Sequence, residues 1–474
     1  MNVKAVKVAG LCLGLSITLA CGVVLAQGVT QAWVARYNGL GNGKDHAQTL
    51  MLDSAGGAYV TGFSDGGGGN YDFATVKYDA DGKQLWVARY DGPSQGADWA
   101  KALALDPAGS VVVAGSSTGE GTGLDFATVK YDSDGNQLWV RRYDGPAQGD
   151  DRLKALAVDA EGNVFAAGDS PGDGGRAESL IIKYDRDGEL LWSLRSGLPG
   201  VSRSLAAIAV DDEGNVYATG SIAPRPRHMN FVTTKYDPQG NELWAAYHDW
   251  SANDFARYLV LDDWGNLYVA GDLVSGPEGT DGRRHQDFAI VKYGTDGKEL
   301  WSKAFDGGKG SDDVVAALQL GPHGSVYLAA NSLPAESDPE RPATEYITLR
   351  YEADGNSMWL ARNPGPQQTV SMLHDLAVDT LGNRYLMASS RGAPKRQPTL
   401  TIIGYNPQGD VLWTTQQEGL MTTATPGLSL DAAGNLWLAG TTADSEDYLV
   451  VNYSLVGATQ TSAEPATVLT PGVR

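Results

Sequence analysis

Residues 72–92 read DFATVKYDADGKQLWVARYDG, and residues 125–145 read DFATVKYDSDGNQLWVRRYDG. The two stretches differ at three positions and begin 53 residues apart. A protein usually has a single active site, whereas a structural unit can occur many times in one sequence. The near-copy therefore indicates a repeated building unit, and the rest of the chain shows how often it recurs.

Three ladders of residues carry this unit along the whole chain. The tryptophan ladder has steps of 52 to 58 residues and consists of Trp33, Trp86, Trp139, Trp192, Trp244, Trp301, Trp359 and Trp413. The tyrosine ladder consists of Tyr78, Tyr131, Tyr184, Tyr236, Tyr293, Tyr351, Tyr405 and Tyr453. The third has the form D-x-x-G and consists of Asp53, Asp106, Asp159, Asp211, Asp262, Asp379 and Asp431, with Gly321 in the sixth unit. Repetition of this length predicts a propeller or a solenoid.

One unit resolves into four short strands. In the second copy these are KALALD (101–106), SVVVAG (110–115), DFATVKYD (125–132) and NQLWVRRYD (136–144). Asp-Gly between alternating segments predicts a tight hairpin with positive φ at both turn positions. Four antiparallel strands in about 53 residues match one propeller blade. We therefore predict an all-β propeller with four-stranded antiparallel blades.

The two ends of the repeat predict how the ring closes. A lone strand with a tryptophan, AWVARY (32–37), precedes the first full set of four strands. The last unit has only three strands, in LSLD (428–431), NLWLAG (435–440) and DYLVVNYS (447–454). The lone strand then completes the last blade, which gives eight blades over residues 27–456 and leaves no open sheet edge at the closure. A seven-bladed ring is the alternative.

Units such as LALDPAGSVVVAG and LDFATVKYDSDGNQLW (103–115 and 124–139) resemble the SBBP-type beta-propeller repeat of secreted bacterial proteins. The resemblance covers residues 33–456 and implies a propeller and export, with no shared reaction. That family is usually seven-bladed. The turn-Gly-x-x-x-Trp pattern is also similar to pyrroloquinoline-quinone dehydrogenases and a related non-enzymatic outer-membrane assembly scaffold. The adjacent cysteines that those dehydrogenases carry have no counterpart after residue 21.

The N-terminus predicts export. Lys4 and Lys7 precede an apolar run over residues 8–26 that ends in Val24-Leu25-Ala26. This pattern is typical of a signal peptide, residues 1–26, and places the mature protein in the periplasm or outside the cell with no integral membrane span. An uncleaved anchor and lipid attachment at Cys21 are alternatives. The tail, residues 457–474, is rich in Thr, Ala and Pro, which predicts disorder.

Composition excludes several classes of function. Both cysteines, Cys12 and Cys21, lie in the signal segment, so the mature chain has no disulfide, thiolate metal site or cysteine nucleophile. A formal charge of −21 disfavours nucleic acid and anionic lipid as partners and favours cationic ones. The six histidines show no metal-ligand spacing, and no hydrolase or phosphate-binding motif appears. We expect a monomeric, non-catalytic binding or protein-interaction module without a cofactor. The alternative is a propeller lyase or hydrolase with its site at the central channel.

One further ladder is the candidate binding site. Eight residues before the D-x-x-G position stand Asp45, Asp98, Asp151, Asp254 and Asp313, with Arg203, Ser371 and Thr423 in the other units. The first strand of a propeller blade is the innermost one, so these carboxylates would ring one mouth of the channel and could hold calcium or a small cationic ligand. The alternative is that each aspartate accepts N–H groups of its neighbouring loop.

The other repeated residues have structural interpretations. The tryptophans should pack between blades, where large aromatic rings bury most area. The turns YDADG and YDSDG resemble fragments of calcium loops but offer few ligands, which favours plain hairpins. The copies differ most in four loops on one face, residues 168–179, 220–230, 271–287 and 330–345. Such loops house binding specificity or reflect drift in solvent.

Overall fold

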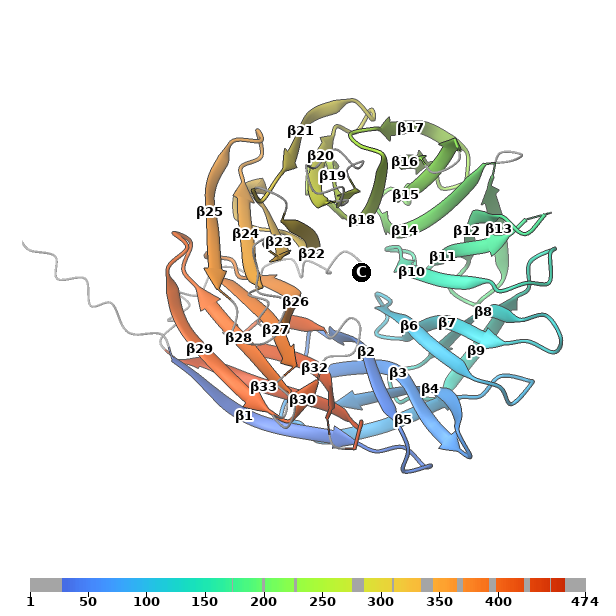
Figure 1. Cartoon of the computed structure of the whole chain (residues 1–474). Helices are drawn as coiled ribbons and strands as arrows, with labels where there is room; N and C mark the ends of the chain where they lie inside the picture. Colours follow the sequence, from blue (N-terminus) through green and yellow to red (C-terminus); the bar gives the residue numbers. More distant parts are fainter. Residues whose placement is uncertain are drawn as a thin grey trace, which may run out of the picture.

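The computed structural model describes residues 28–172, 174–197, 201–225, 228–274, 285–308, 311–333, 344–364, 370–391, 398–421, 427–443 and 445–456. Within them every regular element is a β-strand except the 3-10 turn η1 (Pro322–Gly324). Figure 1 shows the strands arranged as a ring of blades around a central axis. The predicted signal peptide and the predicted disordered tail lie outside the described residues.

The first four blades follow the chain in order, with four strands in each. They are β2 (Asp45–Leu52), β3 (Ala58–Gly67), β4 (Asn70–Tyr78) and β5 (Gln84–Tyr90); β6 (Asp98–Leu105), β7 (Val111–Thr118), β8 (Leu124–Tyr131) and β9 (Gln137–Tyr143); β10 (Arg152–Val158), β11 (Val164–Pro171), β12 (Ala177–Tyr184) and β13 (Leu190–Ser196); and β14 (Ser202–Val210), β15 (Val216–Arg225), β16 (His228–Tyr236) and β17 (Glu242–His248).

The next three blades repeat this order, and the eighth draws its strands from both ends of the chain. Blades five to seven are β18 (Asn253–Leu261), β19 (Leu267–Val274), β20 (Gln286–Tyr293) and β21 (Glu299–Phe305); β22 (Asp312–Leu320), β23 (Val326–Leu333), β24 (Glu345–Tyr351) and β25 (Ser357–Pro364); and β26 (Val370–Val378), β27 (Arg384–Arg391), β28 (Thr399–Tyr405) and β29 (Val411–Glu418). The eighth contains β30 (Leu420–Met421), β31 (Leu428–Leu430), β32 (Leu436–Thr442), β33 (Tyr448–Val456) and β1 (Gly28–Tyr37).

The number of sheets and the number of blades differ by one. Hydrogen bonds between the described strands form seven sheets, one of which has eight strands. That sheet consists of two complete meanders, β14–β17 and β18–β21, which are joined by the single parallel pair Met229–Asn253. Counted as four-stranded meanders, the described residues form eight blades, and Figure 1 shows them in turn around the ring.

The N-terminal strand closes the ring. β1 pairs antiparallel with β33 from Gly28–Val456 to Tyr37–Tyr448, so the first described strand lies beside the last. The inner strand of this blade is divided into β30 and β31, both of which pair with β32. The closure of the propeller by the chain's first strand is therefore as the order of strands in the sequence predicts.

The hydrophobic core lies between the blades. Val112 and Ala114 of β7 are fully buried in one cluster with Leu180 and Ile182 of β12, in the next blade. Both faces of the middle strands are covered by neighbouring blades, which explains their nearly continuous runs of Val, Ala and Ile rather than a strict alternation with polar residues. The core is a series of such layers around the ring.

Six of the eight ladder tryptophans join their blade to the next one. The indole N–H of Trp86 donates to the carbonyl of Ser133, in the β8–β9 turn of the following blade, at 2.9 Å. A Cβ at the turn residue Gly135 would lie 2.7 Å from Trp86 Cδ2, so the ring packs directly against backbone. The donor–acceptor pairs of this kind are Trp33–Ala80, Trp86–Ser133, Trp139–Arg186, Trp192–Pro238, Trp244–Thr295 and Trp301–Ala353.

The hairpin turns differ from the prediction in their backbone conformation. In the turn between β4 and β5, Gly82 has φ +83°, and Asp81 is not among the residues of positive φ. Gly82 N–H donates to the Asp79 carbonyl at 3.0 Å, and Asp79 Oδ1 accepts the N–H groups of Asp81 and Lys83 at 3.1 and 2.9 Å. The side chain of Asp79 therefore supports an ordinary turn followed by a left-handed glycine, and two positive φ angles are not needed.

Candidate functional site

The five aspartates of the predicted ring are all fully buried at the start of the innermost strands. Their carboxylates accept N–H groups from the loop that leads into the strand. The pairs are Gly39–Asp45 at 2.7 Å, Gly92–Asp98 at 2.5 Å, Gly145–Asp151 at 2.6 Å, Trp250–Asp254 at 2.7 Å and Gly307–Asp313 at 2.6 Å. This is the loop-binding geometry that was the alternative to an open ring of carboxylates.

The three remaining positions of that ladder have no carboxylate. Arg203 donates to Thr234 Oγ1 at 2.6 Å, and Ser371 is buried. Thr423 lies outside the described residues. The ladder position is thus buried in six of the seven described blades, and in the remaining one a half-buried arginine occupies it.

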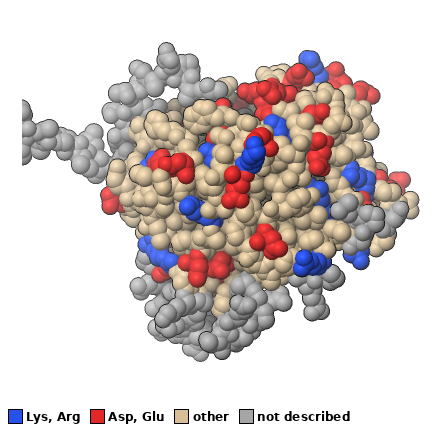
Figure 2. Space-filling view, turned by 90° about the horizontal axis from the view of Figure 1, so that it is seen from above, with Lys and Arg blue, Asp and Glu red and all other residues tan. Residues whose placement is uncertain are grey.

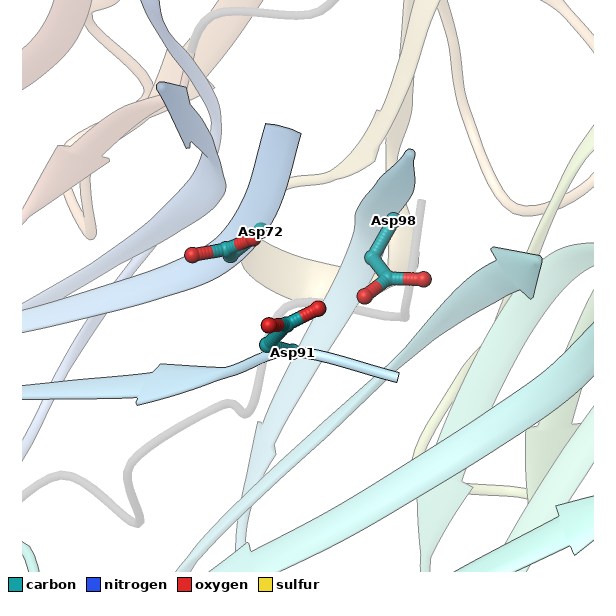
Figure 3. A group of neighbouring side chains, drawn as sticks. All are labelled: Asp72, Asp91 and Asp98. Atoms are coloured by element: carbon teal, nitrogen blue, oxygen red, sulfur yellow. The ribbon is translucent and has the colours of Figure 1, made fainter. Parts of the chain in front are cut away.

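Three of the five ring aspartates, Asp98, Asp151 and Asp313, lie near two acidic residues of the preceding blade. One carboxylate oxygen from each of Asp72, Asp91 and Asp98 lies within 4.8 Å of the others, and Figure 3 shows these three side chains converging at the junction of blades one and two. The corresponding groups are Asp125, Asp144 and Asp151 between blades two and three, and Asp287, Asp306 and Asp313 between blades five and six. No such group among the described residues contains two members of the predicted ring.

In two of these three acidic groups, an arginine side chain forms an ion pair with one of the aspartates. Arg89, from β5, donates to Asp72 Oδ2 at 2.8 Å, to Ser64 Oγ at 2.7 Å and to Tyr37 OH of the preceding blade at 3.0 Å. Arg142 makes the matching contacts to Asp125, Ser117 and Tyr90 one blade later. A charge-assisted network of this kind holds blades together.

These arginines recur in the sequence at a fixed distance from the tryptophan ladder, in addition to the ladders described above. Arg89, Arg142 and Arg195 each stand three residues after a ladder tryptophan. Arg195 pairs with Glu178 at 3.1 Å and contacts Ser170 and Tyr143 in the same way. Repetition of a charged residue at a fixed offset inside an apolar strand indicates a buried ion pair.

A second repeated ion pair lies at the opposite ends of the strands. Lys130 in β8 lies 2.8 Å from Asp106 of its own blade, and both residues are more than nine-tenths buried. It also donates to the Arg186 carbonyl of the next blade at 2.9 Å. The equivalent pairs, at 3.6 to 4.0 Å, are Lys77–Asp53, Lys183–Asp159, Lys235–Asp211 and Lys292–Asp262. Five of the D-x-x-G aspartates therefore serve both their turn and a lysine of the same blade.

Burial affects the pKa of ring aspartates such as Asp98 and Asp151. Burial raises the pKa of Asp98, and the hydroxyl of Ser117 and the N–H groups of Gly92 and Thr118 oppose that rise. Burial likewise raises the pKa of Asp151 against the Ser170 hydroxyl and the Gly145 N–H. Desolvation of the charged form is the largest cause in both cases. The ring carboxylates are thus enclosed groups that accept a loop N–H group, while the Oδ1 atoms of Asp45, Asp151 and Asp313 are buried without a hydrogen bond.

The substitution Asp98→Asn tests this structural role. Asp98 accepts N–H groups on both oxygens, from Gly92 and from Thr118, and an asparagine would turn its own NH2 toward one of them. We expect the free energy of unfolding to fall by about 1–3 kcal/mol, the cost of leaving a buried donor unpaired. Denaturant unfolding measures this, with the exposed Asp134→Asn as the matched control. An unchanged midpoint would contradict a role in holding the loop.

The residue after the ring position differs from blade to blade, and in six of the seven described blades it is more exposed than the ring residue. The set is His46, Trp99, Arg152, Ser204, Phe255, Val314 and Met372. Trp99 and Met372 are 37% and 55% exposed, whereas their neighbours Asp98 and Ser371 are buried. Successive side chains of a strand point to opposite sides, so a shift of one residue changes a buried position into an accessible one. We name this set the inner-rim residues.

The variable loops are described only in part. Residues 173, 226–227, 275–284 and 334–343 of the four segments lie outside the described residues. The loops connect the second and third strands of blades three to six, and they lie at the same ends of the strands as the inner-rim residues. That face is therefore the one on which the blades differ most from one another.

Part of the chain is similar to a known protein family. Residues 72–223 match the family model PQQ_2, described as Outer membrane protein assembly factor BamB. The match spans less than half of the chain and supports a β-propeller repeat family, while the SBBP type remains a prediction. No curated protein matches the chain. The described part of the chain contains no helix with the length and hydropathy of a membrane span.

Solved structures that are similar to this chain include two enzymes and a protein of unknown function. An ulvan lyase of polysaccharide lyase family PL25 is 13% identical over 88% of this chain and 95% of its own, with a TM-score of 0.45. A protein of unknown function from Dyadobacter fermentans is 12% identical over 90% and 99%, with a TM-score of 0.43. The acylaminoacyl peptidase of Pyrococcus horikoshii is 10% identical over 84% and 57%, with a TM-score of 0.43. Likenesses this distant say nothing about the activity of the present chain.

Proposed function

We propose that this protein is a non-catalytic binding module that holds a protein partner in the periplasm or outside the cell. The observation that carries the proposal is the contrast between the buried ladder positions and the inner-rim residues. The ladder has an aspartate that holds a loop in five of the seven described blades, whereas the inner rim has a different side chain in each described blade. A surface built from unlike residues on a uniform scaffold is suited to recognition.

The composition of the inner rim supports a protein as the partner. Trp99, Arg152 and Met372 are all exposed, and tryptophan, arginine and methionine are enriched at the centres of protein–protein interfaces. On the outer edge seen in Figure 2, acidic and basic side chains lie close together, so this view shows no broad field of one sign. The family model that matches residues 72–223 is described as an outer membrane protein assembly factor, and a binding role agrees with that description.

A site-specific crosslinking experiment tests the proposal. A photoreactive residue placed at Met372 should crosslink one protein in the producing cell, and the substitution Trp99→Ala in the same chain should remove that crosslink without changing the melting temperature. The matched control places the photoreactive residue at Leu138, which is 54% exposed on the outer strand of its blade. Equal crosslinking at both positions would contradict recognition by the inner rim, and polysaccharide or peptide cleavage by the purified chain would contradict a non-catalytic role.

A further inference from the structure

The junction between blades five and six contains three aspartates that the proposed function does not use. Asp287 lies in β20, Asp306 follows β21, and Asp313 lies in β22 of the next blade. One carboxylate oxygen from each lies within 4.8 Å of the others. The group therefore spans two blades and brings three formal negative charges together.

The same three positions occur at two other junctions, where a cation is built in. Arg89 pairs with Asp72, and Arg142 pairs with Asp125, each at 2.8 Å. The residue three positions after the ladder tryptophan of blade five is Ala304. The junction of blades five and six thus has the acidic group without its guanidinium.

The neighbouring arginine of blade six does not replace that guanidinium. Arg362 of β25 donates to Glu345 Oε2 at 3.2 Å and to the Gly307 carbonyl at 2.5 Å. Among the described residues, the Arg362 guanidinium is therefore engaged by Glu345 and by the backbone rather than by the three aspartates.

A buried oxygen without a hydrogen bond is the second observation that indicates a ligand. Asp313 is fully buried, and its Oδ2 accepts the Gly307 N–H at 2.6 Å and the Ser311 hydroxyl at 3.0 Å. Its Oδ1 is buried and accepts no hydrogen bond. Buried polar atoms are nearly always paired, so an unpaired carboxylate oxygen inside an acidic group calls for a positive partner.

We propose that Asp287, Asp306 and Asp313 bind one calcium ion that joins blades five and six. Calcium takes oxygen ligands at 2.3–2.6 Å, so two of its ligands can stand up to about 4.6–5.2 Å apart, and three oxygens that all lie within 4.8 Å of one another can bind the same ion. Magnesium requires shorter bonds of 2.0–2.1 Å and a tighter arrangement. Three carboxylates supply part of the coordination sphere, and water fills the rest. The site is independent of the inner rim and of any partner.

Calcium titration of the mature chain, stripped with EDTA, tests the proposal. Calorimetry should show one bound calcium ion per chain, and calcium should raise the melting temperature, because a ligand that binds the folded state stabilises it. Asp287→Asn should weaken binding by about tenfold or more through loss of one charged ligand. Ala304→Arg should abolish binding, since it restores the ion pair found at the other two junctions, and it should melt in EDTA at least as high as the parent.

The matched control is Asp72→Asn, which changes the arginine-paired group and should leave calcium binding unchanged. No binding by the parent, or full binding by both Asp287→Asn and Ala304→Arg, would overturn the proposal. Tighter binding of magnesium than of calcium would overturn the choice of ion. If Asp287→Asn does not fold, Ala304→Arg still decides the question, because it adds a side chain on the surface side of β21 and removes no ligand.

Discussion

Deletion of residues 28–37 is expected to abolish cooperative unfolding of the monomer. This segment is β1, which pairs with β33 along its whole length and supplies the outer strand of the eighth blade. Its removal deletes the buried Tyr37, whose hydroxyl accepts an N–H of Arg89 at 3.0 Å, and it deletes Trp33, whose ring lies 4.9 Å from Trp437. Loss of one large aromatic side chain costs about 3–5 kcal/mol, and a whole domain is stable by only about 5–15 kcal/mol.

The measurement is guanidinium unfolding followed by circular dichroism, together with size-exclusion chromatography. The deleted chain should aggregate or unfold gradually, because β33 becomes an unpaired edge strand that can pair with another molecule. Deletion of residues 460–474, which removes no described residue, is the control and should leave the transition unchanged. A monomer with the parent's unfolding midpoint would show that the ring does not depend on β1.

The fold could be predicted from the sequence because the repeat makes local and global signals agree. Each unit contains two Gly-containing hairpin turns and a tryptophan at a constant offset, and the lone strand before the first unit matches the strand missing from the last. The backbone of the turns could not be predicted as well. An Asp-Gly pair fits several hairpin geometries. Which geometry forms depends on the N–H groups that the aspartate at the start of the turn accepts, and in the turn between β4 and β5 this residue is Asp79.

The candidate site was harder to predict than the fold. The ladder showed that Asp98 and its equivalents recur at the innermost strands, but repetition cannot tell which side of the strand a residue faces. The structure places Asp98 in the blade junction and Trp99 in the accessible position. The repeated residue is the structural one, and the position that changes between blades is the candidate for recognition. Position 304 carries alanine instead of arginine. This difference could be interpreted only after the structure had placed three aspartates, Asp287, Asp306 and Asp313, close together.

One blade departs from the uniform core in a way that predicts a stabilising substitution. Arg384, at the start of β27, is fully buried. The other seven blades have small or branched aliphatic residues at this position, all fully buried: Ala58, Val111, Val164, Val216, Leu267, Val326 and Leu436. The Arg384 guanidinium lies 3.6 Å from the centroid of the Trp359 ring, and its three nitrogens have no hydrogen-bond partner. Burial lowers its pKa to about 10, so it is still charged at neutral pH.

Arg384 also stands in the way of the hydrogen bond that Trp359 would make to the next blade, as equivalent tryptophans of other blades do. The indole N–H of Trp301 donates to the Ala353 carbonyl of the next blade at 3.1 Å, whereas the indole nitrogen of Trp359 is buried without a partner. A Cβ at Gly409, in the turn that should meet Trp359, would lie 3.8 Å from an Arg384 nitrogen instead of against the ring. The guanidinium therefore occupies the space in which the other tryptophans meet the turn glycine.

Replacing Arg384 with leucine is expected to raise the free energy of unfolding by about 1–3 kcal/mol. A cation over an aromatic ring contributes about 2 kcal/mol, which is less than the cost of burying a charge with unpaired donors. Leucine removes that cost, restores the side chain that blades five and eight carry, and leaves the turn free to accept the Trp359 N–H. Denaturant unfolding at neutral pH measures the change. Arg384→Lys keeps the buried charge and should give no gain, so a loss of stability in Arg384→Leu with none in Arg384→Lys would show that the cation stabilises this junction.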